Sequence, residues 1–557
     1  MMRRNSLLWI APVMWLSAVV MAQPQSSAPA TAPAPPSAAK VIAAHSDQAM
    51  FTHSNNCLAC HNNLTSPTGE DVSIGASWRG TLMANAARDP YFHASVRRET
   101  MDHASKAADI EDECAACHMP GAQKMAHGSG GRGEVFSHLP ITAGGEALAA
   151  DGISCTVCHQ IAPEGLGTTA SFNGNFTVAA PLADGTRRAF GPLSPDAGRR
   201  RIMRSVSGFE QVSSPHIRQS ELCATCHTLI TQAFGPNGEV IGSLPEQMNY
   251  QEWRHSAFFD EQKSCQSCHM PRIDGPVRVS SVLGDYRDGL SRHVFVGGNA
   301  FMLRIMNRFR AELGMEATSA ELAATTNATV QQIARDTATV SITDAAVSNG
   351  ALGISVAVSN ITGHKFPTGY PSRRAWLHLT VRDASGRVVF ESGAVEPSGA
   401  IVGNDGDAAA PSFEPHYREI SRADEVQIYE SIMGTPAGQP TTGLLQATQY
   451  LKDNRLLPRG FNKATAPAEI AVFGDAANDP DFTGEGDRVR YQVALGSTPA
   501  AGLNVDVELR YQSIGYRWAK NLSSYDAKEP KAFLGYYDAL ASSSSLVAAR
   551  ASRRVAP

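Results

Sequence analysis

The chain has 557 residues, of which 18% are charged, and its formal net charge at pH 7 is −5. A chain of this length is expected to form two domains. The acidic balance argues against nucleic acid as a partner, because nucleic acids are bound by basic surfaces.

The first residues have the pattern of a secretory signal peptide. Two arginines precede an apolar run from Leu7 to Met21, and small residues suit cleavage after Ala22. The run is shorter than the roughly 20 residues that a membrane span needs. We therefore expect a signal peptide over residues 1–22, a periplasmic or extracellular location, and no transmembrane segment in the mature chain. Residues 23–44 are rich in Ala, Pro and Ser and predict a linker.

Five copies of the pentapeptide Cys-x-x-Cys-His follow, and they use every cysteine of the chain. The cysteines are Cys57 and Cys60, Cys114 and Cys117, Cys155 and Cys158, Cys223 and Cys226, and Cys265 and Cys268. The histidines are His61, His118, His159, His227 and His269. This pentapeptide is the attachment signal of a c-type haem, in which both thiols bind the haem covalently and the histidine binds the iron from the proximal side. The sequence predicts five covalently attached haem c groups.

Zinc is the alternative metal for such motifs. Four-cysteine zinc sites would use the pairs two at a time, and five pairs do not divide in that way. Zinc would also not explain a histidine directly after every second cysteine. We therefore favour haem.

The composition of the chain changes near residue 320. Residues 45–322 hold all five motifs and are expected to form a pentahaem cytochrome c domain of short helices and loops around the haems. An amphipathic helix is predicted near its end, from Phe301 to Leu313. Residues 323–515 alternate apolar and polar side chains in short segments and predict an antiparallel β-sandwich-like domain. Residues 516–557 are expected to form a helical tail. The predicted fold class is α+β.

The predicted strands fall in seven segments, with a hairpin turn over Asp383–Gly386 between the third and the fourth. The segments are 338–343, 352–358, 375–381, 388–390, 426–429, 489–495 and 505–511.

The sixth ligand of each iron decides whether a haem carries electrons or binds a substrate. Twelve of the seventeen histidines lie outside the motifs, so a second histidine could serve every iron. Their placement near the motifs favours His103, His216, His255 and His293 as distal ligands. His53, His127 and His138 are the alternatives.

His364 is a further candidate distal ligand, in a Gly- and Pro-rich loop between two predicted strands. A loop of this kind holds side chains in fixed positions. The expectation is that His364 binds a haem iron across the domain boundary and that Lys365, Arg373 and Arg374 pair with haem propionates. An ordinary exposed hairpin loop is the alternative.

Two other charged segments are less specific. The arginines at 199, 200, 201 and 204 could dock a partner, neutralise propionates or form a solvated loop. The acidic turns 404–407 and 475–487 fit no defined calcium-binding loop.

The motif region resembles the superfamily of multihaem c-type cytochromes, which includes the tetrahaem cytochromes linked to hydroxylamine oxidation and the pentahaem nitrite reductases. Within it, the chain is similar to exported cytochromes with a C-terminal β domain. The phrases that carry this resemblance are Asp89-Pro-Tyr-Phe, Ser220-Glu-Leu-Cys-Ala-Thr-Cys-His, Tyr250-Gln-Glu-Trp-Arg-His, Gly297-Gly-Asn and Gly363-His-Lys-Phe-Pro-Thr-Gly. The resemblance implies mainly bis-histidine haems in close contact. The nitrite reductases usually have Lys in one motif and long helices at the C-terminus, and this chain has neither feature.

The sequence therefore predicts an electron-transfer protein with redox protein partners and no catalytic residue. The alternative is a multihaem reductase in which one five-coordinate haem acts on a small nitrogen or sulfur oxyanion. A third hypothesis makes the β domain a docking module.

Overall fold

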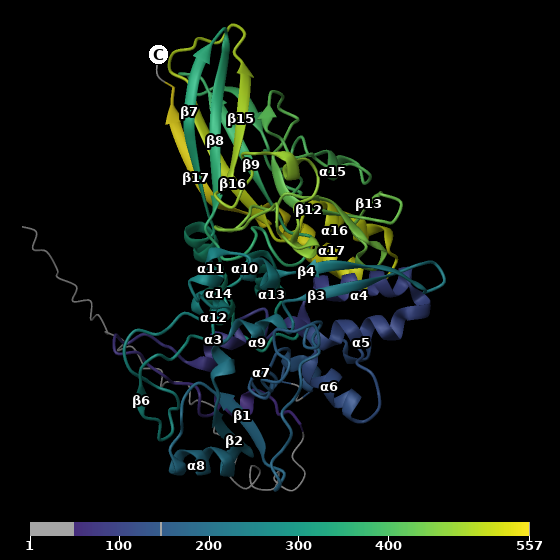
Figure 1. The fold of residues 1–557 in the computed structure, drawn as a ribbon, viewed down its shortest axis with the longest axis vertical. Helices are drawn as coiled ribbons and strands as arrows, with labels where there is room; N and C mark the ends of the chain where they lie inside the picture. The colour runs from purple at the N-terminus through teal and green to yellow at the C-terminus, as the bar shows by residue number, and fades with distance from the viewer. Residues whose placement is uncertain (1–49, 145–146, 556–557) are drawn as a thin grey trace, which may run out of the picture.

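The computed structural model describes residues 50–144 and 147–555. The predicted signal peptide and linker lie outside these residues. Within them, no helix is both long enough and apolar enough to cross a membrane. The motif-bearing half and the strand-rich half lie at opposite ends of the molecule (Figure 1).

The first half consists of short helices and loops, with three small two-stranded sheets. Its helices are α2 (Asn55–Leu58), α3 (Ile74–Arg79), α4 (Pro90–Asp102), α5 (Ala107–His118), α6 (Pro120–Gly128), α7 (Cys155–Cys158), α8 (Ala197–Ser207), α9 (Ser220–Ala224), α10 (Asn249–Arg254), α11 (Ala257–Asp260), α12 (Cys265–His269), α13 (Ala300–Arg308) and α14 (Ser319–Asp336). Its strands are β1 (Arg187–Gly191), β2 (Phe209–Ser213), β3 (Leu229–Phe234), β4 (Val240–Gln247), β5 (Val277–Arg278) and β6 (Tyr286–Arg287).

Local signals explain where the longer helices begin. α4 starts at Pro90, whose ring suits the first helical position, and the Asp89 side chain accepts hydrogen bonds from two backbone N–H groups of the first turn. α14 starts with a capping box between Thr318 and Glu321. The predicted helix near Phe301 is confirmed as α13.

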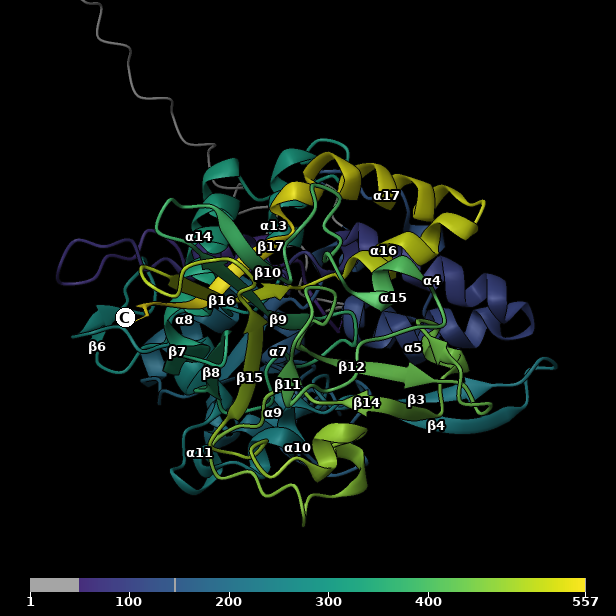
Figure 2. The same cartoon turned by 90° about the horizontal axis from the view of Figure 1, so that it is seen from above.

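Two sheets form the β sandwich of the second half. One has seven strands, in the order β13-β12-β9-β16-β17, with β10 beside β9 and β14 beside β12. The other has the order β11-β15-β8-β7. The bounds are β7 (Ala338–Ser348), β8 (Ala351–Asn360), β9 (Arg374–Arg382), β10 (Val388–Ser392), β11 (Glu419–Ile420), β12 (Ile428–Gly434), β13 (Pro440–Thr441), β14 (Gln449–Asp453), β15 (Asp487–Ala494), β16 (Asn504–Gln512) and β17 (Ser545–Arg554). Figure 2 shows these strands from above.

Alternating side chains build the core between the sheets. Every second residue of β8 and β15 is buried, among them Val356 and Val489. They pack against residues such as Leu379 and Val507 of the facing sheet in one apolar cluster. The mixed α+β fold class predicted from the sequence is confirmed.

The end of the chain differs from the expected helical tail. The helices α16 (Tyr516–Asn521) and α17 (Lys528–Leu540) are present, and α17 packs beside α4 of the first half. The last described residues, however, form β17, which pairs with β16 along its whole length. Its alternation was missed because exposed serine and arginine residues follow the apolar start of the strand. The predicted boundary at residues 322 and 323 also falls inside α14.

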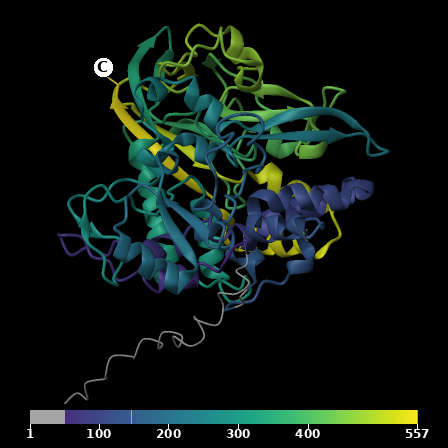
Figure 3. The same cartoon turned by 60° about the horizontal axis from the view of Figure 1, so that its bottom comes forward.

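Apart from one large cluster that α4 and α13 share with α16 and α17, the first half contains small apolar clusters. One cluster surrounds Phe92 and Phe234, another surrounds Phe51 and Phe176, and a third lies around Leu64 and Val277. Figure 3 brings this half (purple to teal) forward. Clusters of this size suit a domain that is completed by bulky apolar groups.

Candidate haem sites

Each of the five motifs lies on or beside a short helix. The first motif follows the start of α2, the second ends α5, the third forms α7, the fourth overlaps α9 and the fifth forms α12. In a helical turn, residues three and four positions apart lie on one face. In α5 and α12, which cover the whole motif, the two thiols and the imidazole therefore lie on one face, as covalent attachment of one haem requires.

The motif histidines are oriented by backbone carbonyl groups. The Nδ1 atoms of His61, His118, His159 and His269 lie 2.7, 3.2, 2.5 and 2.5 Å from the carbonyl oxygens of Val279, Ala86, Phe190 and Val296. A metal-binding histidine commonly donates its second ring N–H to a carbonyl, which fixes the tautomer and leaves Nε2 for the metal. Four of the five proximal histidines therefore have the hydrogen bond that iron ligation needs.

The remaining motif histidine, His227 of the fourth motif, is buried beside Arg373. Burial is the main cause that lowers its pKa to about 4, and His269, Arg373 and His364 contribute to the same shift. The ring is thus neutral at pH 7, which is the form that binds a metal.

Close contacts join the motifs into one connected group. Cys57 lies beside Cys155, Cys117 beside Cys226, and Cys223 beside Cys265. The third motif adjoins the segment before the fourth, where His216 Nε2 lies 2.9 Å from the Ile161 carbonyl oxygen. The spatial order therefore runs from the first motif through the third to the fourth, which also contacts the second and the fifth.

Serine side chains connect two of these motif pairs by hydrogen bonds. Ser54 Oγ accepts a hydrogen bond from the backbone N of Cys155 (3.2 Å), and Ser220 Oγ accepts one from the backbone N of Cys265 (3.1 Å). Each serine lies three residues before the first cysteine of its own motif. The same contact thus sets the spacing of the first and third motifs and of the fourth and fifth.

Two motif histidines face a second histidine. The ring centres of His159 and His293 lie 6.4 Å apart with planes 22° from parallel, and those of His269 and His364 lie 6.3 Å apart with planes 16° from parallel. Two imidazoles on opposite sides of one metal, each with a metal–nitrogen bond of about 2 Å, have their centres about 6 Å apart. The separation of both pairs suits one iron between the rings.

The second histidine of each pair has its own orienting hydrogen bond. His293 Nδ1 donates to the Ser291 carbonyl (3.2 Å), and His364 Nδ1 donates to the Lys365 carbonyl (3.0 Å). Burial lowers the pKa of both rings, that of His293 to about 4. Both rings are neutral at pH 7, and neither Nε2 has a hydrogen-bond partner among residues 50–144 and 147–555.

The other three predicted distal ligands differ in their surroundings. His103 is buried and its Nε2 has no hydrogen-bond partner among the described residues. His255 is exposed and donates Nδ1 to the Gln251 carbonyl (2.8 Å). His216 is buried, but Ser214 Oγ and the Ile161 carbonyl engage both of its ring nitrogens. To bind iron, His216 would have to release the carbonyl.

The alternative histidines are also placed. His53 lies beside the first motif, with Nε2 3.4 Å from Asp151 Oδ1. His127 forms an exposed ion pair with Asp112, and His138 lies in a short 3-10 helix. His93 bonds the Ala87 carbonyl through Nε2 (2.7 Å).

A buried ionic network fixes the loop that carries His364. Glu252 of α10 accepts a hydrogen bond from the Lys365 backbone N (3.1 Å) and another from Thr368 Oγ1 (2.5 Å). Lys365 Nζ binds Asp453 (2.7 Å), and Arg455 binds both Asp453 and Glu252. The network joins the helix before the fifth motif to the sandwich.

Two of the three predicted propionate partners are committed to other residues. Lys365 is fully buried and paired with Asp453, and Arg374 is buried and forms a two-fold pair with Asp407 at 2.8 Å. Sequence patterning did not distinguish a buried cation from an exposed one here. Arg373 lies near His227 and His364 and, unlike Lys365 and Arg374, is not committed to an ion pair among the described residues.

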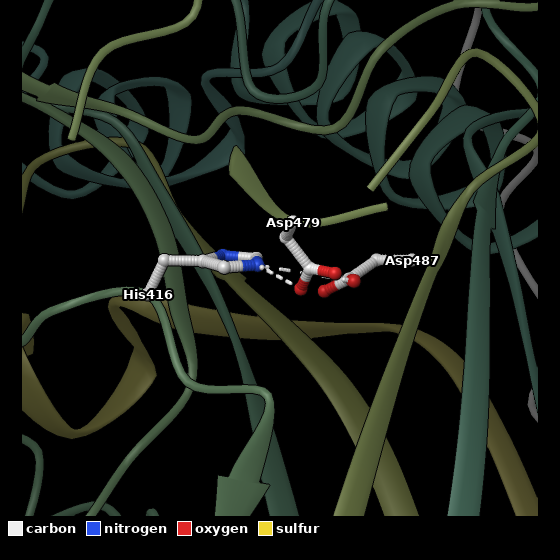
Figure 4. A group of neighbouring side chains, drawn as sticks. All are labelled: His416, Asp479 and Asp487. Carbon is white, nitrogen blue, oxygen red and sulfur yellow. Dashed lines mark hydrogen bonds and ion pairs between the residues drawn. The ribbon is translucent and has the colours of Figure 1, made fainter. Parts of the chain in front are cut away.

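A second group of side chains with metal-ligand chemistry lies in the sandwich (Figure 4). His416, Asp479 and Asp487 are buried, and their potential ligand atoms lie within 4.8 Å of one another. Both aspartates belong to the acidic segment that sequence analysis singled out.

Hydrogen bonding shows that this group is a polar network rather than a metal site. The amides of Gln427 and Asn454 have their oxygens fixed by backbone N–H donors, so both direct N–H groups at His416 Nδ1 (2.8 and 3.1 Å). The Nδ1 atom must therefore accept, and the proton lies on Nε2, which donates to Asp479 (3.1 Å). A protonated Nε2 cannot bind a metal.

The residues present fit haem c. The two thiols of each motif are three residues apart, four motif imidazoles are oriented by a carbonyl, and two imidazole pairs have a separation that one metal could bridge. The spacing of the motifs predicted attachment, whereas the pairs His159–His293 and His269–His364 depend on segments far apart in the chain.

Comparison with solved structures identifies a similar fold. The chain is similar to a crystal structure of a penta-heme cytochrome c552 from Thermochromatium tepidum, with a TM-score of 0.52 and 16% sequence identity over 91% of this chain and 100% of that chain. At this identity the similarity shows a shared fold. No family model and no curated protein matches the chain.

The buried network beside His364 yields a stability prediction. Burial alone would raise the pKa of Asp453, but Arg455 and Lys365 outweigh burial and hold it at about 2. The ionised Asp453 therefore stabilises the folded state above about pH 4, and this stabilisation is lost as the pH falls toward 2. We expect Asp453→Asn to lower the free energy of unfolding by about 3–5 kcal/mol at pH 7, because two buried cations lose their partner.

Chemical denaturation at pH 7 measures this loss. The matched control is Asp424→Asn, which removes an exposed ion pair to Arg422 and should cost far less. Adding Lys365→Met to Asp453→Asn should recover part of the loss. Equal losses for Asp453 and Asp424 would contradict the role given to the buried network.

The polar network of the sandwich yields a pH prediction. Burial, with a smaller contribution from Asp479, raises the pKa of Asp487 to about 7. The folded state therefore holds a proton that the unfolded state releases near pH 4, so stability falls as the pH rises from about 4 to about 7. We expect Asp487→Asn to reduce this decline by on the order of 2–4 kcal/mol.

Urea unfolding at pH 5 and pH 8 tests this expectation, with Asp538→Asn on the exposed face of α17 as the control. A decline of the same size in the Asp487 variant and the parent would show that another group titrates.

Proposed function

We propose that this protein is an exported, periplasmic or extracellular, pentahaem c-type cytochrome that relays electrons through closely spaced, mainly bis-histidine haems. The observation that carries the proposal is the close packing of the Cys-x-x-Cys-His motifs, in which Ser54 bonds the first to the third, His216 bonds the segment before the fourth to the third, and Ser220 bonds the fourth to the fifth. The similar fold of the penta-heme cytochrome c552 supports it. When bound, haem supplies one-electron chemistry at its iron.

The protein residues have three roles in this proposal. The ten cysteines attach the haems, and His61, His118, His159, His227 and His269 bind the irons from the proximal side. His293 would complete the site of the third motif and His364 that of the fifth, since their rings face His159 and His269. A second imidazole saturates the iron and excludes substrate, which favours electron transfer over catalysis.

The candidate ligands His293 and His364 can be tested separately. We expect His364→Ala to convert one haem per chain from low spin to high spin and to let that haem bind carbon monoxide after reduction. His293→Ala should do the same for a different haem. Absorption and electron paramagnetic resonance spectra measure both changes.

The matched control is His378→Ala, because His378 lies in β9 and bonds Glu391 far from the motifs. An unchanged spectrum in the His364 variant would refute its ligation, whatever the result for His293.

A reductase with one five-coordinate haem is the second candidate function. The observation in its favour is an acidic cluster near the second motif, in which Glu99 and Glu246 are buried and Glu113 is half-buried; burial raises the pKa of Cys114, and these three carboxylates add to the shift. Burial raises the pKa of Glu246 to about 7, so this carboxyl could transfer a proton near neutral pH. No histidine ring faces His118 within the part of the chain that the structure describes.

The parent protein distinguishes the two functions. The relay predicts wholly low-spin ferric iron and no spectral change when carbon monoxide is added after reduction. The reductase predicts one haem equivalent that binds carbon monoxide, together with reduction of nitrite or hydroxylamine by reduced viologen that Glu246→Gln slows about 10- to 100-fold. Glu239→Gln, on the exposed β3–β4 turn, is the control.

A further inference from the structure

The first motif lies at one end of the connected group of motifs. Its segment is bonded to the third motif through Ser54 Oγ and the backbone N of Cys155 (3.2 Å), whereas cysteines of the fourth motif lie beside those of the second, third and fifth. An electron relay needs a place where electrons enter or leave, and an end of the series is a natural position for one.

One exposed loop is bonded directly to this motif. His61 Nδ1 donates to the Val279 carbonyl (2.7 Å), and Ser281 donates to the Cys60 carbonyl through both its backbone N (2.8 Å) and its hydroxyl (3.1 Å). The loop thus orients the proximal histidine and covers the motif. A molecule bound on this loop would lie beside the first haem site.

The loop presents apolar side chains to solvent. Val282, Leu283 and Tyr286 are 50, 64 and 62% exposed. Leu283 has a φ of +53°, which a leucine rarely adopts, and a side chain on Gly284 would come within 2.2 Å of the Ser280 carbonyl. The turn therefore holds Leu283 outward at a cost in backbone strain, and strain of this kind gathers at functional surfaces.

Helix α8 extends the same surface. Arg199 Nε donates to the Leu283 carbonyl (2.7 Å) and its Nη2 pairs with Asp285 (2.6 Å). Along the exposed side of α8, Ile202 and Val206 are 40 and 49% exposed one turn apart. Figure 1 shows α8 and β6 together at the end of the molecule away from the sandwich. We call α8 and residues 277–287 the docking face.

The docking face is basic, although the whole chain is acidic. It contains six arginines and one aspartate, Asp285, against a net charge of −5 for the chain. Arg199, Arg200 and Arg204 pair with nearby acids, but Arg201, Arg278 and Arg287 form no ion pair with any residue from 50 to 144 or 147 to 555. Asp288 is an exposed carboxylate at its edge.

We propose that the docking face binds an acidic redox protein beside the first motif. An apolar centre with a charged surround is typical of transient protein interfaces, and complementary charge raises the rate of encounter. The acidic charge of the chain itself disfavours a second copy as the occupant. The proposal rests on the function proposed above, since a redox partner is useful only to a haem protein.

A reduced plant-type [2Fe–2S] ferredoxin is a suitable acidic probe. On electron transfer its cluster loses one electron and one ferric haem becomes ferrous. Binding to the oxidised holoprotein is measured on a biosensor over a range of salt concentrations, and electron transfer is measured by stopped flow. Reduction by dithionite is run in parallel, because its failure would count against the proposed function and not against the docking face.

Two variants separate the charged and apolar contributions. We expect Arg201→Glu/Arg278→Glu/Arg287→Glu to weaken binding and slow electron transfer at least about 10-fold at low salt, and to remove most of the salt dependence. We expect Leu283→Asn to weaken binding several-fold with the salt dependence retained, and the protein to stay folded because asparagine accepts a positive φ. The control, Arg550→Glu/Arg554→Glu on β17, should stay within about twofold of the parent.

Several results would overturn the proposal. One is salt-independent or absent binding of ferredoxin to the parent protein. A second is an equal effect of the β17 control and the triple variant. A third is a change in oligomeric state in the triple variant with unchanged electron transfer, which would assign the face to a second copy. A fourth is binding to vesicles of anionic phospholipid in place of ferredoxin.

Discussion

The contact between His269 and His364 depends on a buried set of charges that spans the two halves of the molecule. Glu252 comes from the helix before the fifth motif, and Lys365, Asp453 and Arg455 come from the sandwich. Buried charges are tolerated only when they are paired, so the four groups can be satisfied in one arrangement of the two halves. That arrangement puts the His364 ring 6.3 Å from the His269 ring. The sandwich therefore acts as part of the candidate haem site and not only as an attached domain.

Hydrogen bonds to neighbouring groups also hold the motifs in place throughout the motif-bearing half. Backbone carbonyls set the rings of four motif histidines, and Ser54 and Ser220 set the spacing of two motif pairs. The result is a series that begins at the first motif and branches at the fourth. The basic docking face lies at the beginning of the series, and the buried acidic cluster around Glu246 lies near one of its branches.

Sequence patterns predicted what depends on neighbouring residues. The motif spacing predicted haem attachment, and the alternation of side chains predicted β7, β8, β9, β10, β15 and β16. The strand β17 was missed because its exposed half is rich in serine and arginine, and its partner β16 lies more than thirty residues away. The spatial order of the motifs could not be read from their order in the chain, since the first contacts the third.

The candidate ligands also divide into features that neighbouring residues determine and features that distant residues determine. Placement beside a motif suggested His216, but a serine and a distant carbonyl engage both of its ring nitrogens. Turn chemistry alone suggested His364, yet its ring faces a motif histidine nearly one hundred residues earlier. Lys365 was expected at a propionate because sequence does not reveal burial, and it forms the centre of the ionic network instead.

The most direct test of this account is the position of iron in crystals of the purified protein, located by anomalous diffraction at the iron absorption edge. The account predicts one iron between His269 and His364 and another between His159 and His293, each about 2 Å from both facing nitrogens. Iron bound to His269 or His159 with the facing histidine turned away would contradict it.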